Sequence, residues 1–152
     1  MNWKWLSFEQ LSREDLYEVL KVRQAIFVIE QNCVYQDADG LDPTSWHLLG
    51  WHEDTTGRKL VAYLRVVFPG GKYPEPSIGR VLTTASVRGT GAGQALMREA
   101  INHIALEYPQ KSIRISAQQY LEKFYFEFGF ETVSAPYDED GIPHIEMLRK
   151  AP

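Results

Sequence analysis

Three alternating glycines, Gly89, Gly91 and Gly93, follow Arg88 at the point where a strand-like apolar pattern gives way to a helical one. Glycine lets the backbone take turns that a side chain obstructs, and the first amides of a helix have no partners within it. Because the helix dipole also favours negative charge at that end, such a segment can bind a phosphate or pyrophosphate. The feature therefore predicts a strand, a phosphate-binding loop and a helix in succession.

Two better-known phosphate loops do not fit this segment. A Walker loop ends in Gly-Lys-Ser/Thr, whereas Gly93 is followed by Gln94 and Ala95. A Rossmann fingerprint requires a third glycine at position 94 or 96, depending on which glycine comes first, and those positions hold Gln94 and Leu96. The remaining alternative is a glycine turn that binds nothing.

The length and charge of the chain exclude several classes of protein. Its 152 residues suit one domain, which we place over 1–152, and 16 basic against 20 acidic residues give a net charge of -4, with no basic field for nucleic acid. The longest apolar runs, 25–29 and 60–64, are too short to cross a membrane. With one cysteine, Cys33, no internal disulfide can form, and the expected compartment is the cytoplasm.

Hydrophobic periodicity predicts a mixed α/β domain. Ser12 with Asp15 three residues later indicates a helix start, and Gly129 indicates a helix stop. The expected order is a strand over 3–8, a helix over 13–30, a loop over 31–45, strands over 46–52, 60–68 and 78–87, a helix between Gly93 and Pro109, a strand over 112–117, a short helix over 121–128, and strands over 130–134 and 144–148.

The pattern Arg-x-x-Gly-x-Gly at Arg88, Gly91 and Gly93 resembles the acyl-CoA pyrophosphate motif of the Gcn5-related N-acetyltransferases. Downstream, Phe-Tyr-Phe-Glu-Phe-Gly-Phe at 124–130 is similar to the Leu-Tyr-x-x-x-Gly-Phe segment of that family. The resemblance covers nearly the whole chain and implies one domain with a central, mostly antiparallel sheet flanked by helices. More narrowly, three segments resemble the ElaA-like branch: Phe-x-x-Glu-Gln-Asn-Cys at 27–33, Asp-x-Asp-Gly at 37–40, and Glu-Asp-Gly-Ile-Pro-His at 139–144.

The family resemblance implies an acetyl-CoA-dependent N-acetyltransferase that acts on a primary amine. It implies that the backbone of Leu82 and Thr83 pairs with the pantetheine arm, and that Tyr125 is the general acid for the CoA sulfur. The pyrophosphate would be held by Arg88 and by the amides of Gly89, Thr90, Gly91, Ala92 and Gly93. Gln118 stands where many relatives carry an asparagine that contacts the CoA arm, and glutamine can make similar hydrogen bonds.

The general base is not evident from the sequence, and four residues are candidates beside ordered water: Glu30, Asp37, His47 and His144. The acidic stretch around Asp37, Asp39 and Asp42 reads either as a solvated loop or, with Glu30, as a site that attracts a cationic amine. On the second reading Glu30, Asp37, Asp39 and His47 belong to the acceptor site.

We expect no metal site, because His47 and His52 are five positions apart on one predicted strand and so point to opposite faces. Cys33 has no evident base near it in the sequence. The acceptor class stays open among an aminoglycoside, a polyamine, an amino acid and a protein N-terminus. A homodimer could form through the apolar final strands, and the competing function is a non-catalytic acyl-CoA-binding or sensing module on the same fold.

Overall fold

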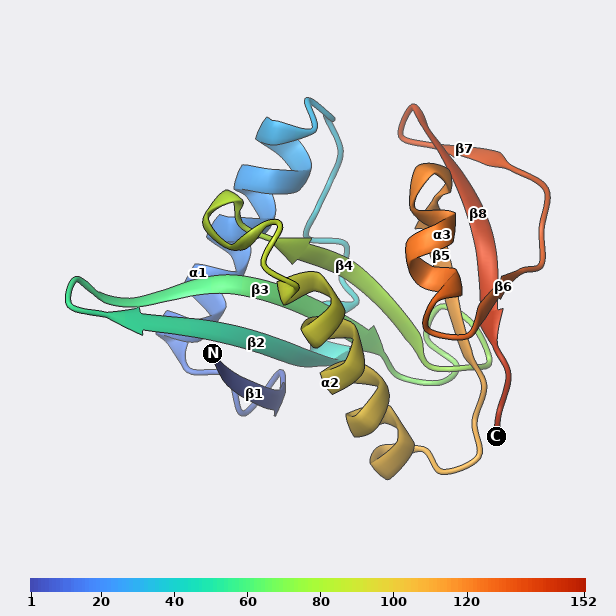
Figure 1. The fold of residues 1–152 in the computed structure, drawn as a ribbon, viewed down its shortest axis with the longest axis horizontal. Helices are drawn as coiled ribbons and strands as arrows, with labels where there is room; N and C mark the ends of the chain where they lie inside the picture. The colour runs from blue at the N-terminus through green and yellow to red at the C-terminus, as the bar shows by residue number, and fades with distance from the viewer.

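Two sheets carry the fold of the computed structural model, which describes residues 1–152, and they diverge towards one end of the molecule (Figure 1). The elements in chain order are β1 (Asn2–Ser7), α1 (Arg13–Arg23), the π-helix η1 (Gln24–Glu30), the 3₁₀ turn η2 (Asp42–Thr44), β2 (Ser45–Asp54), β3 (Gly57–Val67), β4 (Ser77–Thr83), η3 (Ala85–Val87), α2 (Ala92–Glu107), β5 (Ile113–Gln118), η4 (Gln119–Leu121), α3 (Glu122–Phe126), β6 (Phe130–Thr132), β7 (Tyr137–Glu139) and β8 (Ile142–Arg149). The predicted mixed α/β class is confirmed.

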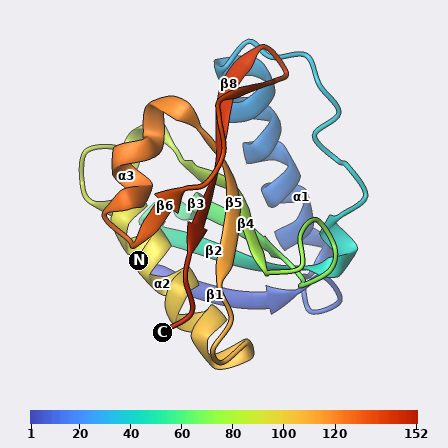
Figure 2. The same ribbon diagram turned by 90° about the vertical axis from the view of Figure 1, so that its right-hand side faces the viewer.

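The first sheet has the order β1-β2-β3-β4, and every neighbouring pair is antiparallel. Side chains alternate between its faces, so Leu48 and Leu64 enter a core with α2, whereas Leu49 and Tyr63 enter a second core with α1. Figure 2 shows α1 and α2 on opposite sides of this sheet. Both faces are buried, which explains why 60–67 forms an almost continuous apolar run.

The second sheet has the order β5-β8-β6, and β7 also pairs with β8. In the β5–β8 ladder, Ala117 lies opposite Ile145 and both face the core that holds α2. The next pair, Gln118 opposite His144, therefore faces the other side of the sheet, away from α2. That side forms one wall of the cleft described below.

Local sequence signals explain how α1 begins and how it continues. Ser12 accepts a hydrogen bond from the Asp15 amide at 3.0 Å, and the Asp15 carboxylate accepts from the Ser12 amide at 3.4 Å, which completes the predicted capping box. The helix does not run as one α-helix to Glu30, as the periodicity predicts. It widens at Gln24 into the π-helix η1, which ends next to the cleft.

Two other expectations about elements are wrong in detail. The strand expected over 78–87 ends at Thr83, because η3 turns the chain before the glycine loop. The connection expected between Pro136 and Pro143 contains β7, which forms a hairpin with β8. Because β8 is hydrogen-bonded to neighbours along both edges, a dimer through the final strands would have to form at the outer edge of β6.

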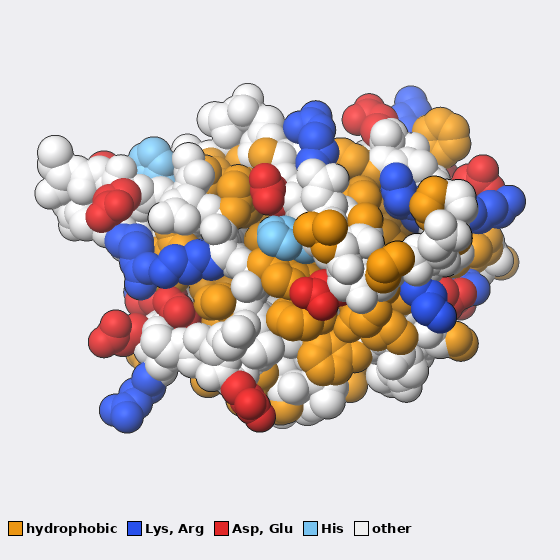
Figure 3. All heavy atoms as spheres, turned by 90° about the horizontal axis from the view of Figure 1, so that it is seen from below, with side chains coloured by type: hydrophobic (Ala, Val, Ile, Leu, Met, Phe, Trp, Pro, Cys, Tyr) orange, Lys and Arg blue, Asp and Glu red, His pale blue; other side chains and the backbone are white.

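The end of the molecule opposite the cleft carries a stack of half-buried aromatic rings. Trp5 lies between Trp46 and His103, with ring centroids 5.4 and 4.7 Å apart, and Phe68 packs against Trp46. Hydrophobic side chains are gathered on this lower side of the molecule (Figure 3). No helix in the chain combines the length and apolar character needed to cross a membrane.

Candidate active site

A cleft opens where β4 and β5 part. At one end the two strands are joined by the hydrogen bond from the Arg114 amide to the Pro76 carbonyl, at 3.2 Å, and from there they diverge (Figure 1). The space between them is a cavity of about 450 Å³, whose walls come from η1, β4, β5, α3 and the β7–β8 hairpin. Each wall of the cleft therefore comes from a different part of the chain.

A bulge in β4 bends the strand beside this cavity. Tyr63 of β3 pairs with Leu82 and Arg65 pairs with Gly79, so β4 has one residue more than β3 over the same stretch. Arg80 lies within the bulge at a φ of 53°, a conformation that is rare for a residue with a side chain. Because the bulge interrupts the ladder, β4 is free to diverge from β5 and to present its edge to the cavity.

The glycine loop presents unpartnered amides where the sequence predicts an anion site. Gly91 is the N-cap of α2 with a φ of 87°, and the amides from Gly91 to Gln94 donate to no carbonyl or side chain of the protein. A Cβ atom built on Gly91 would meet nothing within 4 Å, so the space in front of these amides is open. The residues present therefore fit a pyrophosphate. Thr83 and Arg88 border both this hollow and the main cavity.

The side chain of Arg88 does not point into the anion site. Its Nε and Nη2 atoms donate to the Thr83 carbonyl at 3.1 and 3.0 Å, and its Nη1 lies 2.7 Å from Glu30 Oε1. Arg88 must therefore leave Thr83 and Glu30 before it can bind a phosphate. Glu30, an expected acceptor residue, lies at the cavity wall with its charge balanced by this arginine.

Tyr125 reaches the cavity from the core side. Its ring packs edge-on against Phe124 and Phe130, with centroids 5.1 and 6.1 Å away, and only 6% of the residue is exposed. Burial raises the pKa of its hydroxyl, so the group stays protonated across the physiological range. The structure therefore places a protonated donor at the cavity wall, where the family resemblance implies an acid.

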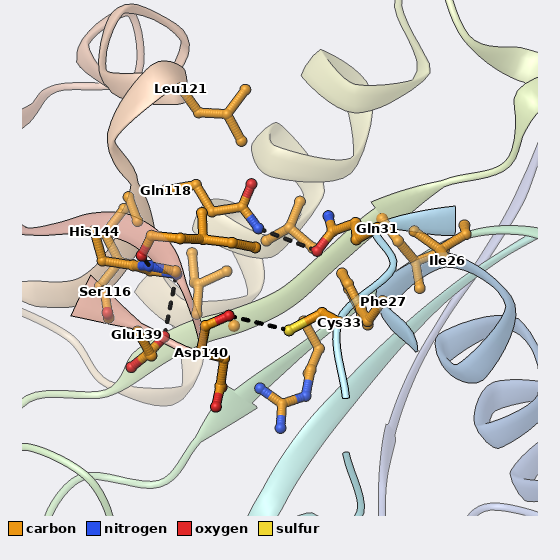
Figure 4. Close-up of a pocket in the computed structure, with 18 of the residues that line it drawn as sticks. Ile26, Phe27, Gln31, Cys33, Ser116, Gln118, Leu121, Glu139, Asp140 and His144 are labelled. Carbon is orange, nitrogen blue, oxygen red and sulfur yellow. Dashed lines mark hydrogen bonds and ion pairs between the residues drawn. The ribbon is translucent and has the colours of Figure 1, made fainter. Parts of the chain in front are cut away.

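Two contacts cross the cleft between its walls (Figure 4). Gln118 Nε2 donates to Gln31 Oε1 at 3.4 Å, and Cys33 Sγ donates to the Asp140 carbonyl at 3.3 Å. Sequence reasoning assigned no role to Gln31 or Asp140. Both lie within segments that resemble the ElaA-like branch, and this resemblance is the sequence feature that could have pointed to them.

His144 and Glu139 form a pair at the same wall (Figure 4). His144 Nδ1 lies 2.7 Å from the Ile142 carbonyl, and Nε2 lies 3.1 Å from Glu139 Oε2. The imidazole is nearly enclosed, whereas the Glu139 side chain is 44% exposed. Of the two candidate bases that are histidines, His144 is thus the one that lines the cavity, and its partner Glu139 lines it too.

The expectation of a solvated acidic loop is wrong, because the loop folds inward onto cations. Asp37 Oδ2 lies 2.8 Å from Arg23 Nε, and Asp42 Oδ1 lies 2.7 Å from Arg23 Nη1. Asp39 is held by Arg65 at 2.6 Å. Three arginines from different elements thus balance three aspartates: Arg23, Arg65 and Arg80 against Asp37, Asp39 and Asp42.

These ion pairs overturn the roles expected for Asp37, Asp39 and His47 at the acceptor site. Burial alone would raise the pKa of Asp42, but hydrogen bonds and charge from Arg23 and Arg65 lower it, so the network stays ionised. His47 is completely buried beneath it, 2.7 Å from the Tyr63 hydroxyl and 3.0 Å from the Asp42 carbonyl, and burial lowers its pKa. None of the three presents a free group to an amine.

No group of three or more His, Cys, Asp and Glu side chains lies close enough together to hold a metal ion. The features that remain are a cleft between diverging strands, free amides at a helix start and a buried tyrosine at the cleft wall. This combination is the one that the family resemblance implies for an acyl-CoA-dependent acyltransferase.

Comparison with known proteins agrees with this class. The family model described as an acetyltransferase (GNAT) domain matches residues 56–151. A UPF0039 protein of Synechocystis is 49% identical over all of this chain and 97% of its own length, and the protein ElaA of Escherichia coli is 41% identical over 99% of this chain and 97% of its own. The chain therefore belongs to the Gcn5-related N-acetyltransferase family, in its ElaA-like branch.

Solved structures share the whole architecture. The crystal structure of an acyl-CoA N-acyltransferase from Pseudomonas aeruginosa superposes with a TM-score of 0.91 at 35% identity, covering 98% of this chain and 99% of that one. The crystal structure of Escherichia coli ElaA gives a TM-score of 0.89 at 42% identity, over 99% and 100% of the two chains. The fold and the general capacity for acyl transfer are therefore those of the family.

Proposed function

We propose that this protein transfers an acetyl group from acetyl-CoA to a primary amine, by direct attack of the amine on the thioester. One observation carries the proposal: the free amides from Gly91 to Gln94 line one hollow, Tyr125 lines the cavity next to it, and Thr83 and Arg88 border both. In an acyl-CoA the pantetheine arm separates the anionic pyrophosphate from the thioester, so these two groups match the two features.

The chain's own groups would hold the co-substrate in three places. The amides of the glycine loop bind the pyrophosphate, and Arg88 joins them after releasing Glu30. The edge of β4 at Leu82 and Thr83 pairs with the amides of the pantetheine arm as an added strand would. Gln118 supplies a further amide from the opposite wall once it parts from Gln31.

Positioning supplies much of the rate in such a reaction, because the amine and the thioester are held in contact. A backbone amide of the β4 bulge would polarise the thioester carbonyl. Tyr125 would donate its proton to the sulfur as the carbon–sulfur bond breaks. The acceptor reaches the thioester from the side of the sheet that carries Gln118 and His144, opposite α2.

The test measures binding and turnover separately. Calorimetry with acetyl-CoA reports whether the cleft binds the co-substrate, and a thiol reagent reports CoA release with kanamycin, spermidine, lysine and an alanine-initiated peptide as acceptors. Acetyl-CoA binding with amine-dependent CoA release supports the proposal. Binding without release from any acceptor contradicts it and favours the acyl-CoA-sensing alternative. Absence of binding would make the glycine loop a structural turn.

A further inference from the structure

His144 is held in an orientation that suits a proton acceptor. It lies near the start of β8, directly opposite Gln118 of β5, on the face of the sheet that looks away from α2. The residue is 7% exposed, and what is exposed borders the cavity that also contains Tyr125. The imidazole and the proposed acid thus border one cavity, with the imidazole on the side open to an acceptor.

The hydrogen bond of Nδ1 fixes which nitrogen is basic. A carbonyl oxygen only accepts hydrogen bonds, so the 2.7 Å contact with the Ile142 carbonyl requires a proton on Nδ1. In the neutral ring the lone pair is then on Nε2. This assignment follows from the backbone of the same strand and needs no ligand.

Glu139 stabilises the other protonation state. When Nε2 gains a proton, it can donate to Glu139 Oε2, which lies 3.1 Å away. Because the Glu139 side chain is half exposed, it can also turn aside while an amine approaches Nε2. Tyr137, whose ring stacks against the imidazole at 6.2 Å, is a further titratable group on this side. Lys72 and Tyr73 of the β3–β4 connection interact electrostatically with Glu139, and Asp140 and Cys33 lie at the same cavity wall.

We infer that His144 Nε2 is the general base of the proposed acetyl transfer, with Glu139 as the residue that positions and stabilises its imidazolium form; the inference rests on the proposed function. The amine nitrogen forms a bond to the thioester carbon, and its surplus proton passes to Nε2. The carbon–sulfur bond breaks with its electron pair going to sulfur, which takes a proton from Tyr125. Solvent then returns the proton from His144 to the tyrosinate, so charges and protons balance.

Two of the other candidate bases, His47 and Asp37, are held away from the cavity. His47 is sealed beneath the ion-pair network, and its Nδ1 faces the Tyr63 hydroxyl. Asp37 is held by Arg23 and Arg80. Glu30 also lines the cavity, but it pairs with Arg88 on the glycine-loop side, whereas the His144–Glu139 pair lies on the wall from which the acceptor would approach.

The first test reads the tautomer without any activity assay. Nitrogen NMR of the histidine side chains should show neutral His144 with its proton on Nδ1 and an unprotonated Nε2. A neutral ring protonated on Nε2 would overturn the assignment.

The second test uses the best acceptor among kanamycin, spermidine, lysine and the alanine-initiated peptide. His144→Gln should lower kcat by about 10²–10⁴-fold at neutral pH and leave the Kd for acetyl-CoA unchanged. Glu139→Gln should move the acidic limb of the kcat/KM profile to lower pH, because the imidazolium loses its anionic partner, and a merely structural residue would not shift that limb. His52→Gln, an exposed histidine on β2, is the matched control and should change neither quantity.

Failure of the base assignment can be distinguished from failure of the proposed acetyltransferase function. If the wild type transfers acetyl groups and His144→Gln retains its kcat, or if Glu139→Gln leaves the acidic limb in place, the base assignment is overturned while the acetyltransferase proposal stands. If the wild type binds acetyl-CoA but acetylates none of the four acceptors, the proposed function fails and the base assignment fails with it.

Discussion

Arg88 and Glu30 join the glycine-loop side of the cleft to the end of η1, with Nη1 of the arginine 2.7 Å from Oε1 of the glutamate. The same guanidinium covers the Thr83 carbonyl, at the edge of β4 where the pantetheine arm would pair. On the proposed function, acetyl-CoA would have to displace the Arg88 side chain before it could use either group. The ion pair would then oppose co-substrate binding.

Removing the Glu30 charge should tighten acetyl-CoA binding. Both side chains are about half exposed, and such ion pairs contribute roughly 0.2–1 kcal/mol, so Glu30→Gln should lower the Kd by at most about fivefold. Calorimetry at low and at high salt measures the change in Kd, and the gain in affinity should be smaller at high salt because salt screens the ion pair. Glu107→Gln is the control: it makes the same charge change at the far end of α2 and should leave the Kd for acetyl-CoA unchanged. A weaker affinity in Glu30→Gln would show that Glu30 instead helps to hold Arg88 in its binding position.

A matched pair of substitutions at Gly91 separates charge from shape. Asn and Asp have nearly the same size, and both tolerate the positive φ of this position better than other side chains. Gly91→Asp places a negative charge before the free amides and should abolish acetyl-CoA binding, whereas Gly91→Asn should retain part of it. Thermal unfolding controls for folding, since an acidic N-cap stabilises a helix. Equal affinities in the two variants would show that the pyrophosphate lies elsewhere.

Tyr125→Phe should slow turnover with little effect on stability. The burial that raises the pKa of the hydroxyl also makes proton transfer to a thiolate less favourable, so we expect a loss in kcat of about 10²-fold, the low end for general acid catalysis. The ring contacts with Phe124 and Phe130 are preserved in the variant. Stopped-flow measurement of CoA release, with urea unfolding alongside, checks both statements. Wild-type kcat in the variant would remove Tyr125 from the mechanism.

Removing a charge from the ion-pair network should lower the stability of the fold and leave acceptor binding unchanged. Asp42 bridges Arg23 and Arg65, so Asp42→Asn removes a negative charge that both buried guanidinium groups share. The substitution should lower the free energy of unfolding by about 3–5 kcal/mol. Urea unfolding at pH 7 measures this loss, with Glu107→Gln as the exposed control. A destabilisation below about 1 kcal/mol would mean that the network contributes little to the fold.

The same network predicts how stability changes with pH. The pKa of Asp39 and that of Asp42 are lower in the folded protein than the usual 3.8, so their contribution is complete above about pH 4 and is lost as the pH falls below it. The lowered pKa of His47 adds an earlier loss, which begins below about pH 6.5. The stability difference between the wild type and Asp42→Asn should therefore narrow below pH 4. A constant difference down to pH 2 would contradict this account.

Local patterns in the sequence predicted the parts of the fold that depend on near neighbours. The capping box at Ser12, the glycine loop before α2 and the stop at Gly129 each lie within a few residues of the element that they control. The short strand β7 was missed because Tyr137–Glu139 offers too few residues for an alternating pattern to stand out. The bulge at Arg80 was missed because no glycine or asparagine occupies the left-handed position.

The acceptor side of the site was beyond such reasoning because its contacts join distant residues. Asp37 meets Arg80 across 43 positions, and Cys33 meets Asp140 across 107. From the sequence, a run of aspartates is expected to be solvated. The arginines that neutralise it are brought close only by the packing of α1, β3 and β4. The glycine loop was found from its own residues, whereas the role of the tyrosine was inferred only because its spacing resembles a family motif.

The π-helix η1 makes the length of this segment critical. Its wider turns are closed by bonds such as the one from the Gln31 amide to the Ile26 carbonyl, and they deliver Glu30, Gln31 and Cys33 to the cleft. Successive residues of a helix are offset by about 100°, so losing a single residue here would rewind the turn as an ordinary α-helix and rotate all three side chains away. Insertions and deletions in this stretch should therefore be far rarer among functional variants of the chain than substitutions.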